Sequence, residues 1–406
     1  MGAMTKVRVF VFLLTIIVVG TVGYLVSLYA RGYRFDGKNL RFSPNGLLVA
    51  NSDPEGASVF VNGELKTATD TTLSLVPGVY DVEIKKEGFL SWKKRLVIEK
   101  EVVTEANASL FRNAPSLTPI TFSGSISPVA SSDFTKIAYA VFPENGDDPT
   151  KVGLWVMETL NLPFGFAKEP RRITDGDLKE ASWIWSPDSR EILLTNKLGI
   201  FLLDTGEFTP QAQRVNVASR LKEIQALWDK EKTTKLEARL RNLPQEHADV
   251  FTRKVHNLAF SPDETKILYT ASGSATFKAD LIKQLPGAST QKQEREIKDG
   301  QTYVYDIKED RNFLIEEDSR ELTISPDFYV ASKKSLSWFP TSGHLVLAED
   351  GKITILDYDG TNRQVVYTGS FVPPYAFPFA STGRLLILTN LGANSSLPNL
   401  YSVTIK

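Results

Sequence analysis

The sequence predicts a mainly β protein made of an N-terminal transmembrane helix, a small antiparallel β-sandwich, and a β-propeller of about five blades with a helical insert. Three observations lead to this fold class. Val9–Ala30 is an apolar stretch of 22 residues without a charged side chain. Short alternating strands separated by turn residues fill residues 49–112. A unit of two apolar strands joined by a polar corner then recurs five times between residues 117 and 406.

Residues 1–31 are expected to form a short cytoplasmic tail and a membrane anchor. At about 1.5 Å per residue, the apolar stretch gives a helix of about 33 Å, enough to cross a hydrocarbon core of about 30 Å. A cleaved signal peptide is the alternative. Its apolar region is usually only about 7–15 residues long, and Leu28 stands where such a peptide needs a small residue. We therefore expect a retained single-pass helix in the cell membrane.

Charges flank this helix on both sides and leave its orientation open. Lys6 and Arg8 precede the helix, while Arg31 and Arg34 follow it. We place the C-terminal domains outside the cytoplasm because of the kind of domains that follow. A spacer at residues 32–48 connects the helix to the first of them.

Residues 49–112 have the pattern of a small antiparallel sandwich. Ala57–Val61 alternates small or polar residues with apolar ones and ends at Asn62-Gly63, the dipeptide that best supports a two-residue hairpin turn. Val79–Ile84 and Trp92–Ile98 alternate in the same way. Several short strands with turn residues between them are typical of a sandwich.

The same stretch carries the motif of a known family. Ser52–Ala57 resembles the signature of the PEGA domain, which is named after the four residues Pro-Glu-Gly-Ala that end this segment. Leu75–Tyr80 and Lys86–Phe89 also fit that family. The resemblance covers about residues 49–112. It implies a β-sandwich module of surface proteins that often lies next to membrane anchors and has no catalytic residues of its own. We expect Phe89 and Trp92 to pack in or beside its core and not to form a carbohydrate platform.

The repeated unit predicts the propeller. Its best-formed copy runs from Trp183 to Leu194, and its corner positions along the chain are 55, 75, 78 and 40 residues apart. A propeller blade takes about 40–50 residues, so two of these gaps hold about 30 extra residues each. We assign the extra residues to a helical insert at 217–243 and a polar loop at 272–300. The five corner residues are Asp133, Asp188, Asp263, Thr341 and Ser381.

Each copy is followed by a third apolar strand, and most copies have a fourth. Leu117–Thr121 resembles the outer strand that the last copy lacks, so we expect it to pair beside Leu400–Ile405 and close the ring. A compressed copy at Ile324–Asp327 could raise the number of blades to six. The unit resembles the TolB-type, WD-like propeller repeat, most clearly in the turn Leu356–Asn362. This resemblance covers about residues 117–406 and implies a fold without a particular function.

Composition and motifs exclude several classes of function. With 47 basic and 48 acidic residues, the net charge of −1 argues against nucleic acid as a partner, because nucleic-acid binding needs a basic face. The chain has no cysteine and only three histidines, His247, His256 and His344, no two of which are close in sequence. No nucleophile elbow, zinc-protease helix or nucleotide-binding glycine pattern occurs. We therefore predict no catalytic residue, no metal and no cofactor.

The helical insert supplies the candidate partner-binding residues. Leu221, Ile224, Leu227 and Trp228 recur at helical spacing and form an apolar stripe. If the insert projects from the ring, this stripe would dock a partner. If the insert folds back, the same stripe would pack on the propeller, and the spacing alone leaves both alternatives open.

Together these features predict a non-catalytic, membrane-tethered envelope protein that presents its propeller as a platform for another envelope protein or for cell-wall polysaccharide. Two alternatives belong to other classes. One is a propeller hydrolase or lyase acting on glycan through paired carboxylates in its channel. The other is a scaffold with reversed topology that faces the cytoplasm.

Overall fold

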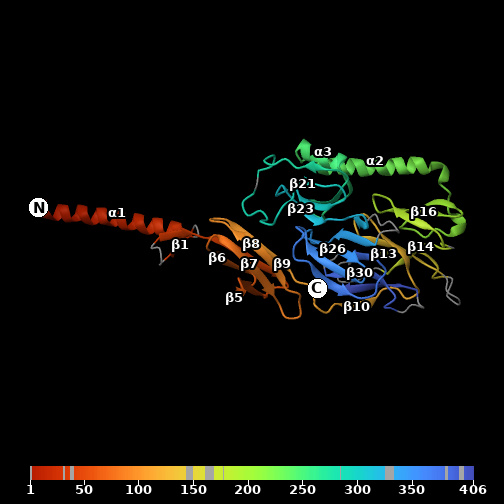
Figure 1. Ribbon diagram of the computed structural model, residues 1–406, viewed down its shortest axis with the longest axis horizontal. Helices are drawn as coiled ribbons and strands as arrows, with labels where there is room; N and C mark the ends of the chain where they lie inside the picture. Colours follow the sequence, from red (N-terminus) through yellow and green to blue (C-terminus); the bar gives the residue numbers. More distant parts are fainter. Residues whose placement is uncertain are drawn as a thin grey trace. The chain divides into compact units, whose positions relative to one another are not determined.

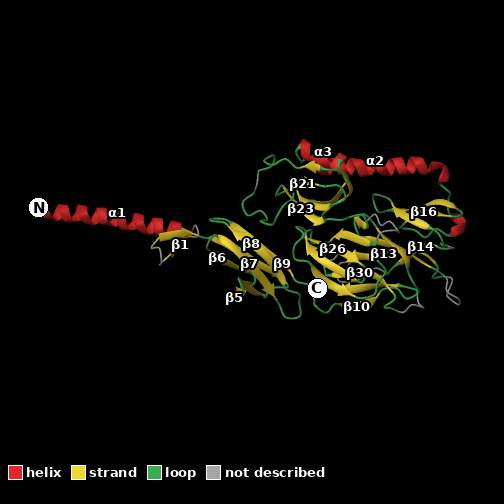
Figure 2. Ribbon diagram, viewed as in Figure 1, coloured by secondary structure: helices red, strands yellow, loops and turns green. Residues whose placement is uncertain are grey.

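The computed structural model describes residues 2–30, 33–36, 41–142, 150–160, 169–176, 178–283, 285–324, 333–379, 383–392 and 397–406. The chain is mainly β and divides into two compact units (Figures 1 and 2). The first unit contains Met1–Leu110 together with Leu285–Gln291, and the second contains Phe111–Gln284 and Lys292–Lys406. We describe each unit by itself.

The first unit begins with α1, an uninterrupted helix from Gly2 to Ala30. Its segment Val7–Ala30 is long and apolar enough to cross a membrane, with a mean hydropathy of 2.7 and no part buried against the rest of the chain. The hydroxyl of Thr15 donates to the Val11 carbonyl at 2.9 Å, and that of Thr21 donates to the Ile17 carbonyl at 2.7 Å. Both hydroxyls are therefore satisfied inside the helix, as a hydrocarbon environment requires.

A two-stranded hairpin follows in the stretch that we expected to be only a spacer. It pairs β1 (Tyr33–Asp36) with β2 (Arg41–Pro44) in antiparallel register. The next strand, β3 (Gly46–Asp53), begins almost immediately after it. A side chain has no room at Gly46, because a Cβ atom there would lie 2.2 Å from the Glu99 carbonyl oxygen.

The sandwich differs from the expected wholly antiparallel arrangement. In its first sheet, β3 lies between β6 (Thr71–Leu75), to which it is antiparallel, and β9 (Val103–Ser109), to which it is parallel. A parallel pair needs a long crossover connection. The whole second sheet lies between β3 and β9 along the chain and supplies that crossover.

The second sheet is antiparallel and has the order β5–β4–β7–β8. The expected turn at Asn62-Gly63 is confirmed, because both residues have positive φ, 51° and 82°, as a two-residue hairpin of this type needs. The strands of this second sheet are β4 (Ser58–Val61), β5 (Glu64–Ala68), β7 (Gly78–Lys85) and β8 (Trp92–Ile98). The side chains packed into the sandwich core include Leu48, Ala50, Val59, Ile84, Trp92, Ala106 and Ala108.

Residues 285–291, which come from the stretch expected to be a polar loop, belong to this first unit. The Val97 amide donates to the Thr290 hydroxyl at 3.3 Å, and the Gln291 side chain donates to the Arg95 carbonyl at 2.7 Å. Because β8 is an edge strand of its sheet, these contacts cover part of an otherwise open edge. The expected loop also contains a short ladder between β20 (Ala275–Thr276) and β21 (Glu296–Ile297), which belongs to the second unit.

The described residues of the second unit form five sheets built on the repeated hairpin, one for each predicted copy. Four connected strands make blade 1 and blade 3, while blade 2 has three. Blade 1 is β11 (Ile126–Ala130), β12 (Lys136–Val141), β13 (Gly153–Glu158) and β14 (Arg171–Thr174), and blade 2 is β15 (Ser182–Trp185), β16 (Glu191–Asn196) and β17 (Gly199–Asp204). Blade 3 is β18 (Val255–Phe260), β19 (Lys266–Ala271), β22 (Thr302–Asp306) and β23 (Arg311–Glu316).

Blades 4 and 5 complete the set. Blade 4 is β24 (Leu322–Ile324), β25 (Lys334–Trp338), β26 (His344–Glu349), β27 (Lys352–Asp357) and β28 (Gln364–Thr368). Blade 5 is β29 (Ala376–Pro378), β30 (Arg384–Thr389), β31 (Asn399–Thr404) and β10 (Ser116–Pro119). The suggested sixth copy does not form a separate sheet in the described part, since β24 joins blade 4 parallel to β25 and residues 325–327 lie outside the described ranges.

The expected closure of the ring is confirmed. β10 pairs antiparallel with β31, and Leu117 lies opposite Val403 in this register. The amide of Ile120 extends the contact by donating to the Leu400 carbonyl at 2.8 Å. The first strand of the propeller therefore completes the sheet made by its last strands (Figure 1).

The helical insert lies between blades 2 and 3. It forms α2 (Leu221–Leu240) as expected, and also α3 (Gln245–Arg253), which we had not predicted. Blades 1 and 2, 3 and 4, and 5 and 1 share hydrophobic clusters, whereas no cluster of the described residues joins blades 2 and 3 or blades 4 and 5. Blade 3 instead packs on Leu240, Val250 and Phe251 of the helices.

Polar contacts attach α2 to both neighbouring blades. The Lys235 ammonium donates to the Pro187 carbonyl of blade 2 at 3.2 Å, and the Arg239 guanidinium lies 2.8 Å from the Glu264 carboxylate of blade 3. Figure 2 shows α2 extending from the side of β16 to α3. The helices therefore link two blades that do not share a core of their own.

Two tryptophans connect neighbouring blades where the sheets do pack directly. Both occupy the position just before a corner. The indole N–H of Trp185 donates to the Val129 carbonyl, and that of Trp338 donates to the Ala259 carbonyl, each at 3.0 Å. In blade 3 the same position is Phe260, whose ring lies 5.1 Å from the Arg239 guanidinium of α2.

We expect Trp185→Phe and Trp338→Phe each to lower the free energy of unfolding by about 1–2 kcal/mol more than a control, because each removes a cross-blade hydrogen bond and leaves a carbonyl without that donor. Trp155→Phe is the control, since the indole of Trp155 donates at an exposed site, to Lys151 of its own blade. Urea unfolding measures the difference. Equal losses in all three variants would contradict the cross-blade role.

Candidate binding surfaces

The corners of three repeats are held by the same side-chain arrangement. A serine hydroxyl donates to the carboxylate two residues later, at 2.6 Å in the Ser131–Asp133 and Ser186–Asp188 pairs and at 2.7 Å in the Ser261–Asp263 pair. The same serine oxygen accepts the amide that begins the second strand, at 2.9 to 3.0 Å. Such side-chain bonds to the backbone stabilise tight turns.

These bonds shift the acidities of the three corner aspartates. Burial of the Asp133 carboxylate acts to raise its pKa, but hydrogen bonds from Ser131 and Thr135 outweigh burial, so the pKa of Asp133 is lowered. The pKa values of Asp188 and Asp263 are lowered in the same way, again against the effect of burial. All three side chains are therefore stabilised as carboxylates in the folded protein.

The corner side of the propeller also carries contacts between blades. The Lys136 ammonium of blade 1 donates to the Ser189 carbonyl of blade 2 at 2.8 Å. The Asp263 amide of blade 3 donates to the Ser342 hydroxyl of blade 4 at 3.0 Å. Many polar groups on this side are thus engaged in holding adjacent blades together.

The opposite side of the blades presents apolar side chains to solvent. Because neighbouring strands are antiparallel, the turns after β16 and β30 and the connection after β10 lie at the strand ends away from the corners. Leu198 is 61% exposed, Leu391 57% and Phe122 80%. We call these three residues the turn-side surface. These three side chains share one side of the blades; a contiguous exposed apolar patch is typical of a contact site, whereas single exposed side chains are common on any protein.

The four stripe residues of α2 do not lie on one exposed surface. Ile224 is buried, and Leu221 and Trp228 are partly buried. Leu227 alone among the four is well exposed, at 58%. This placement favours packing on the propeller for most of the stripe and leaves Leu227 available for contact.

A buried polar network, which sequence spacing did not suggest, includes His247 of α3. The His247 ring nitrogen Nδ1 lies 3.0 Å from the Tyr305 hydroxyl, which donates to the Asp310 carboxylate at 2.8 Å. The Arg295 guanidinium lies 3.1 Å from the same carboxylate. Burial is the main cause of a raised pKa at Tyr305. No substrate could reach this histidine, whose side chain is enclosed, so the network serves to hold α3 and the polar insert on blade 3.

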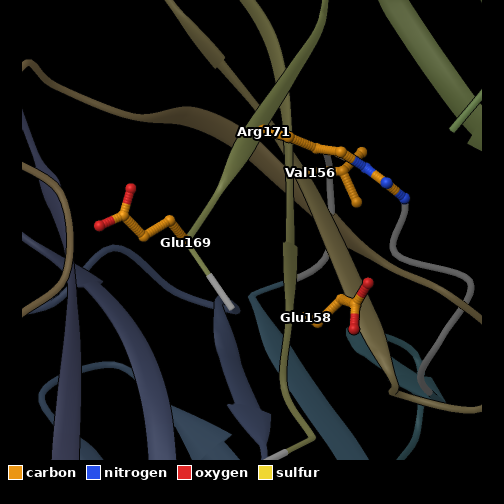
Figure 3. Close-up of a pocket in the computed structure, with 4 residues that line it drawn as sticks. All are labelled: Val156, Glu158, Glu169 and Arg171. Atoms are coloured by element: carbon orange, nitrogen blue, oxygen red, sulfur yellow. The ribbon is translucent and has the colours of Figure 1, made fainter. Parts of the chain in front are cut away.

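A hollow of about 270 Å³ lies on the outer two strands of blade 1. It is lined by Val156, Glu158, Glu169 and Arg171. Figure 3 shows the two carboxylates, Glu158 and Glu169, pointing in different directions. Glycan hydrolysis by two carboxylates needs them on either side of one scissile bond, so this arrangement does not favour that chemistry.

The sandwich carries a second hollow, of about 460 Å³. Trp92 is almost fully buried in the core and Phe89 packs partly against it, as we expected for both residues. Phe60 is covered by the Lys85 ammonium, 5.1 Å from the ring centre, which reduces its use as a stacking platform. The residues lining the hollow are Ser58, Phe60, Lys85, Lys86, Glu87, Phe89 and Ser91.

Metal-binding groups of three or more acidic or histidine side chains are absent from the described part of the chain. The acidic turn after β27 is instead closed by hydrogen bonds. The Thr361 hydroxyl donates to the Asp359 carboxylate at 2.6 Å, and the Asn362 amide donates to the Asp357 carboxylate at 3.3 Å. These carboxylates are thus engaged in the turn itself.

The corner carboxylates predict a defined response to acid. Their pKa values are lowered on folding, so their contribution to stability is full above the usual aspartate pKa of about 3.9 and is lost as the pH falls through the lower folded values. We expect Asp188→Asn and Asp263→Asn each to lower the free energy of unfolding by about 1 kcal/mol at pH 7. Each should also make the free energy of unfolding fall less steeply as the pH is lowered. Asp229→Asn, on an exposed position of α2, is the control. Unfolding by urea between pH 7 and pH 2 tests this, and an unchanged acid dependence in the corner variants would contradict it.

Comparison with known proteins separates the two units. Residues 45–113 match the model of the PEGA domain. No curated protein sequence matches the chain.

Among solved structures, a TolB from Agrobacterium tumefaciens is 11% identical, with 70% of this chain and 80% of that chain covered and a TM-score of 0.24. The β-propeller domain of Swd1 from Myceliophteria thermophila is 9% identical, with 72% of this chain and 100% of that chain covered and a TM-score of 0.29. A chain of a mitotic checkpoint complex is 11% identical, with 72% and 94% covered and a TM-score of 0.32. These scores carry no functional argument. The strand order and register identify the second unit, so the chain combines a PEGA domain at residues 45–113 with a C-terminal β-propeller.

Proposed function

We propose that this protein is a non-enzymatic, single-pass membrane protein of the cell envelope. In this proposal α1 is the anchor, the PEGA domain is a stalk, and the propeller outside the cytoplasm is a platform for another envelope protein or for cell-wall polysaccharide. The observation that carries the proposal is α1 itself. Val7–Ala30 has a mean hydropathy of 2.7, carries a charge only at Arg8, and is not buried against the rest of the described chain.

The difference between the two sides of the propeller supports the platform role. On the corner side, Lys136, Ser342 and the corner aspartates are occupied in turns and cross-blade contacts. On the other side, the three residues of the turn-side surface are 57% to 80% exposed. A partner would gain most by burying this second side.

The distribution of acidic and histidine side chains supports a role without catalysis. The described hollow on blade 1 has its two carboxylates turned apart (Figure 3), and His247 is enclosed in a structural network. Binding by shape and apolar contact needs neither a paired acid nor a nucleophile.

The proposed topology is tested by labelling single cysteines in a chain that has none of its own. Lys232→Cys, at an exposed position of α2, should react with a membrane-impermeant maleimide on intact cells, whereas Ala3→Cys should react only after permeabilisation. The chain should also remain in the membrane fraction after alkaline extraction. The reverse labelling pattern would support the cytoplasmic scaffold, and release by alkali would argue against an anchor.

The platform is tested by photo-crosslinking from single cysteines in cells. We expect a probe on Leu391→Cys or Leu198→Cys to capture one discrete partner, because the turn-side surface faces it. Leu160→Cys is a control of similar exposure, 49%, that follows β13 on the corner side. Leu227→Cys tests whether α2 contributes. Capture from Leu160 but not from the turn-side surface would overturn the assignment, and sensitivity of the product to protease or glycosidase would identify the partner's class.

A further inference from the structure

The parallel pairing of β3 and β9 separates the two ends of the PEGA domain. β3 is the first strand of the sandwich and β9 the last, and they pair over seven positions from Leu47–Val103 to Asp53–Ser109. The chain therefore enters the domain at one end of this pair and leaves it at the other. Six strand steps of about 3.3 Å place these two ends about 20 Å apart.

This geometry decides how tension would act on the domain. A pull on the chain before Gly46 and after Leu110 draws β3 and β9 in opposite directions along their common axis. All ladder hydrogen bonds between them then resist together, whereas strands pulled apart from one shared end would lose their bonds one after another. Each bond is weak on its own, so simultaneous loading of the whole ladder is what makes the pair strong.

We infer that the PEGA domain is a load-bearing link whose β3–β9 pair acts as a shear clamp between the N-terminal helix and the propeller. This inference rests on the proposed tethering for its biological use, because tension arises only if both ends are held. The clamp itself is a property of the fold. It needs no membrane and no ligand to be measured.

The contacts around the pair reinforce the clamp. The ladder is extended at both ends, by the Leu47 amide donating to the Val102 carbonyl at 3.0 Å and by the Leu110 amide donating to the Asp53 carbonyl at 2.9 Å. The side chains of Asn51 and Asn107 add a cross-strand bond of 2.9 Å. These bonds lie at the ends and on the outer face of the pair, so slippage in either direction must break them.

Burial on the inner face protects the ladder from water. Leu48, Ala50, Ala106 and Ala108 from the two strands are at most 3% exposed. Water competes for strained backbone hydrogen bonds, and its exclusion makes each bond harder to replace. β3 also pairs with β6 on its other edge, so β3 is fixed from both sides.

The test compares two pulling directions in the same full-length, detergent-solubilised protein by single-molecule force spectroscopy. One handle is at the N-terminus in both cases. The second is a single cysteine, either Asn113→Cys, beyond the end of β9, or Lys100→Cys, in the turn just before β9. Both positions are exposed. The first pair of handles loads β3–β9 in shear, and the second pulls the two strands apart from the same end.

We expect the sandwich to unfold at a several-fold higher force from Asn113 than from Lys100. Equal forces, or a higher force from Lys100, would overturn the shear clamp. Thermal unfolding of both variants without load shows whether either substitution has changed the fold itself. A second pair of measurements on Asn107→Ala, which removes the outer cross-strand bond, should lower the Asn113 force and leave the Lys100 force nearly unchanged.

The two proposals fail in different ways. A strong directional difference in force together with release of the chain from membranes by alkali would keep the clamp and remove the tether. Firm membrane attachment with equal forces in the two directions would keep the tether and remove the clamp.

Discussion

The pairing of β10 with β31 is the constraint on which the propeller depends. A sheet ending in an unpaired strand exposes a row of backbone donors and acceptors, and β10 supplies the missing partner for the sheet that the C-terminus completes. The same requirement explains other details. Asn216 bridges to Phe201 at the otherwise open edge of blade 2, and residues 285–291 cover part of β8 in the sandwich. Backbone satisfaction therefore organises both units.

Local features of the fold could be predicted from the sequence because neighbouring residues determine them. The hairpin Trp183–Leu194 and the turn Asn62-Gly63 combine alternation with turn residues, and both form as expected. The β10–β31 closure was predictable because one strand lacked a partner and one spare strand existed. The direction in which strands far apart in the sequence pair could not be predicted. An alternating strand has the same pattern in parallel and antiparallel pairs, so the direction of β9 along β3 could not be predicted.

The candidate site was predicted less well, for a related reason. Periodicity located α2 but not the surface that its stripe covers, and the structure buries Ile224 while exposing Leu227. α3 carried a usable signal, since Pro244 precedes a helix whose buried positions His247, Val250 and Phe251 have helical spacing. The meeting of His247 with Asp310 depends on how the insert folds over blade 3, which no short pattern encodes.

The helical layer between blades 2 and 3 gives the ring a sector of adjustable width. Sheets that pack face to face keep a spacing of about 10 Å, and five such spacings would leave the curvature with little freedom. A pair of helices can instead tilt or exchange side-chain volume without shifting the register of any strand. Different side chains on α2 and α3 could therefore alter the spacing of blades 2 and 3, which these helices contact, while every strand keeps its register.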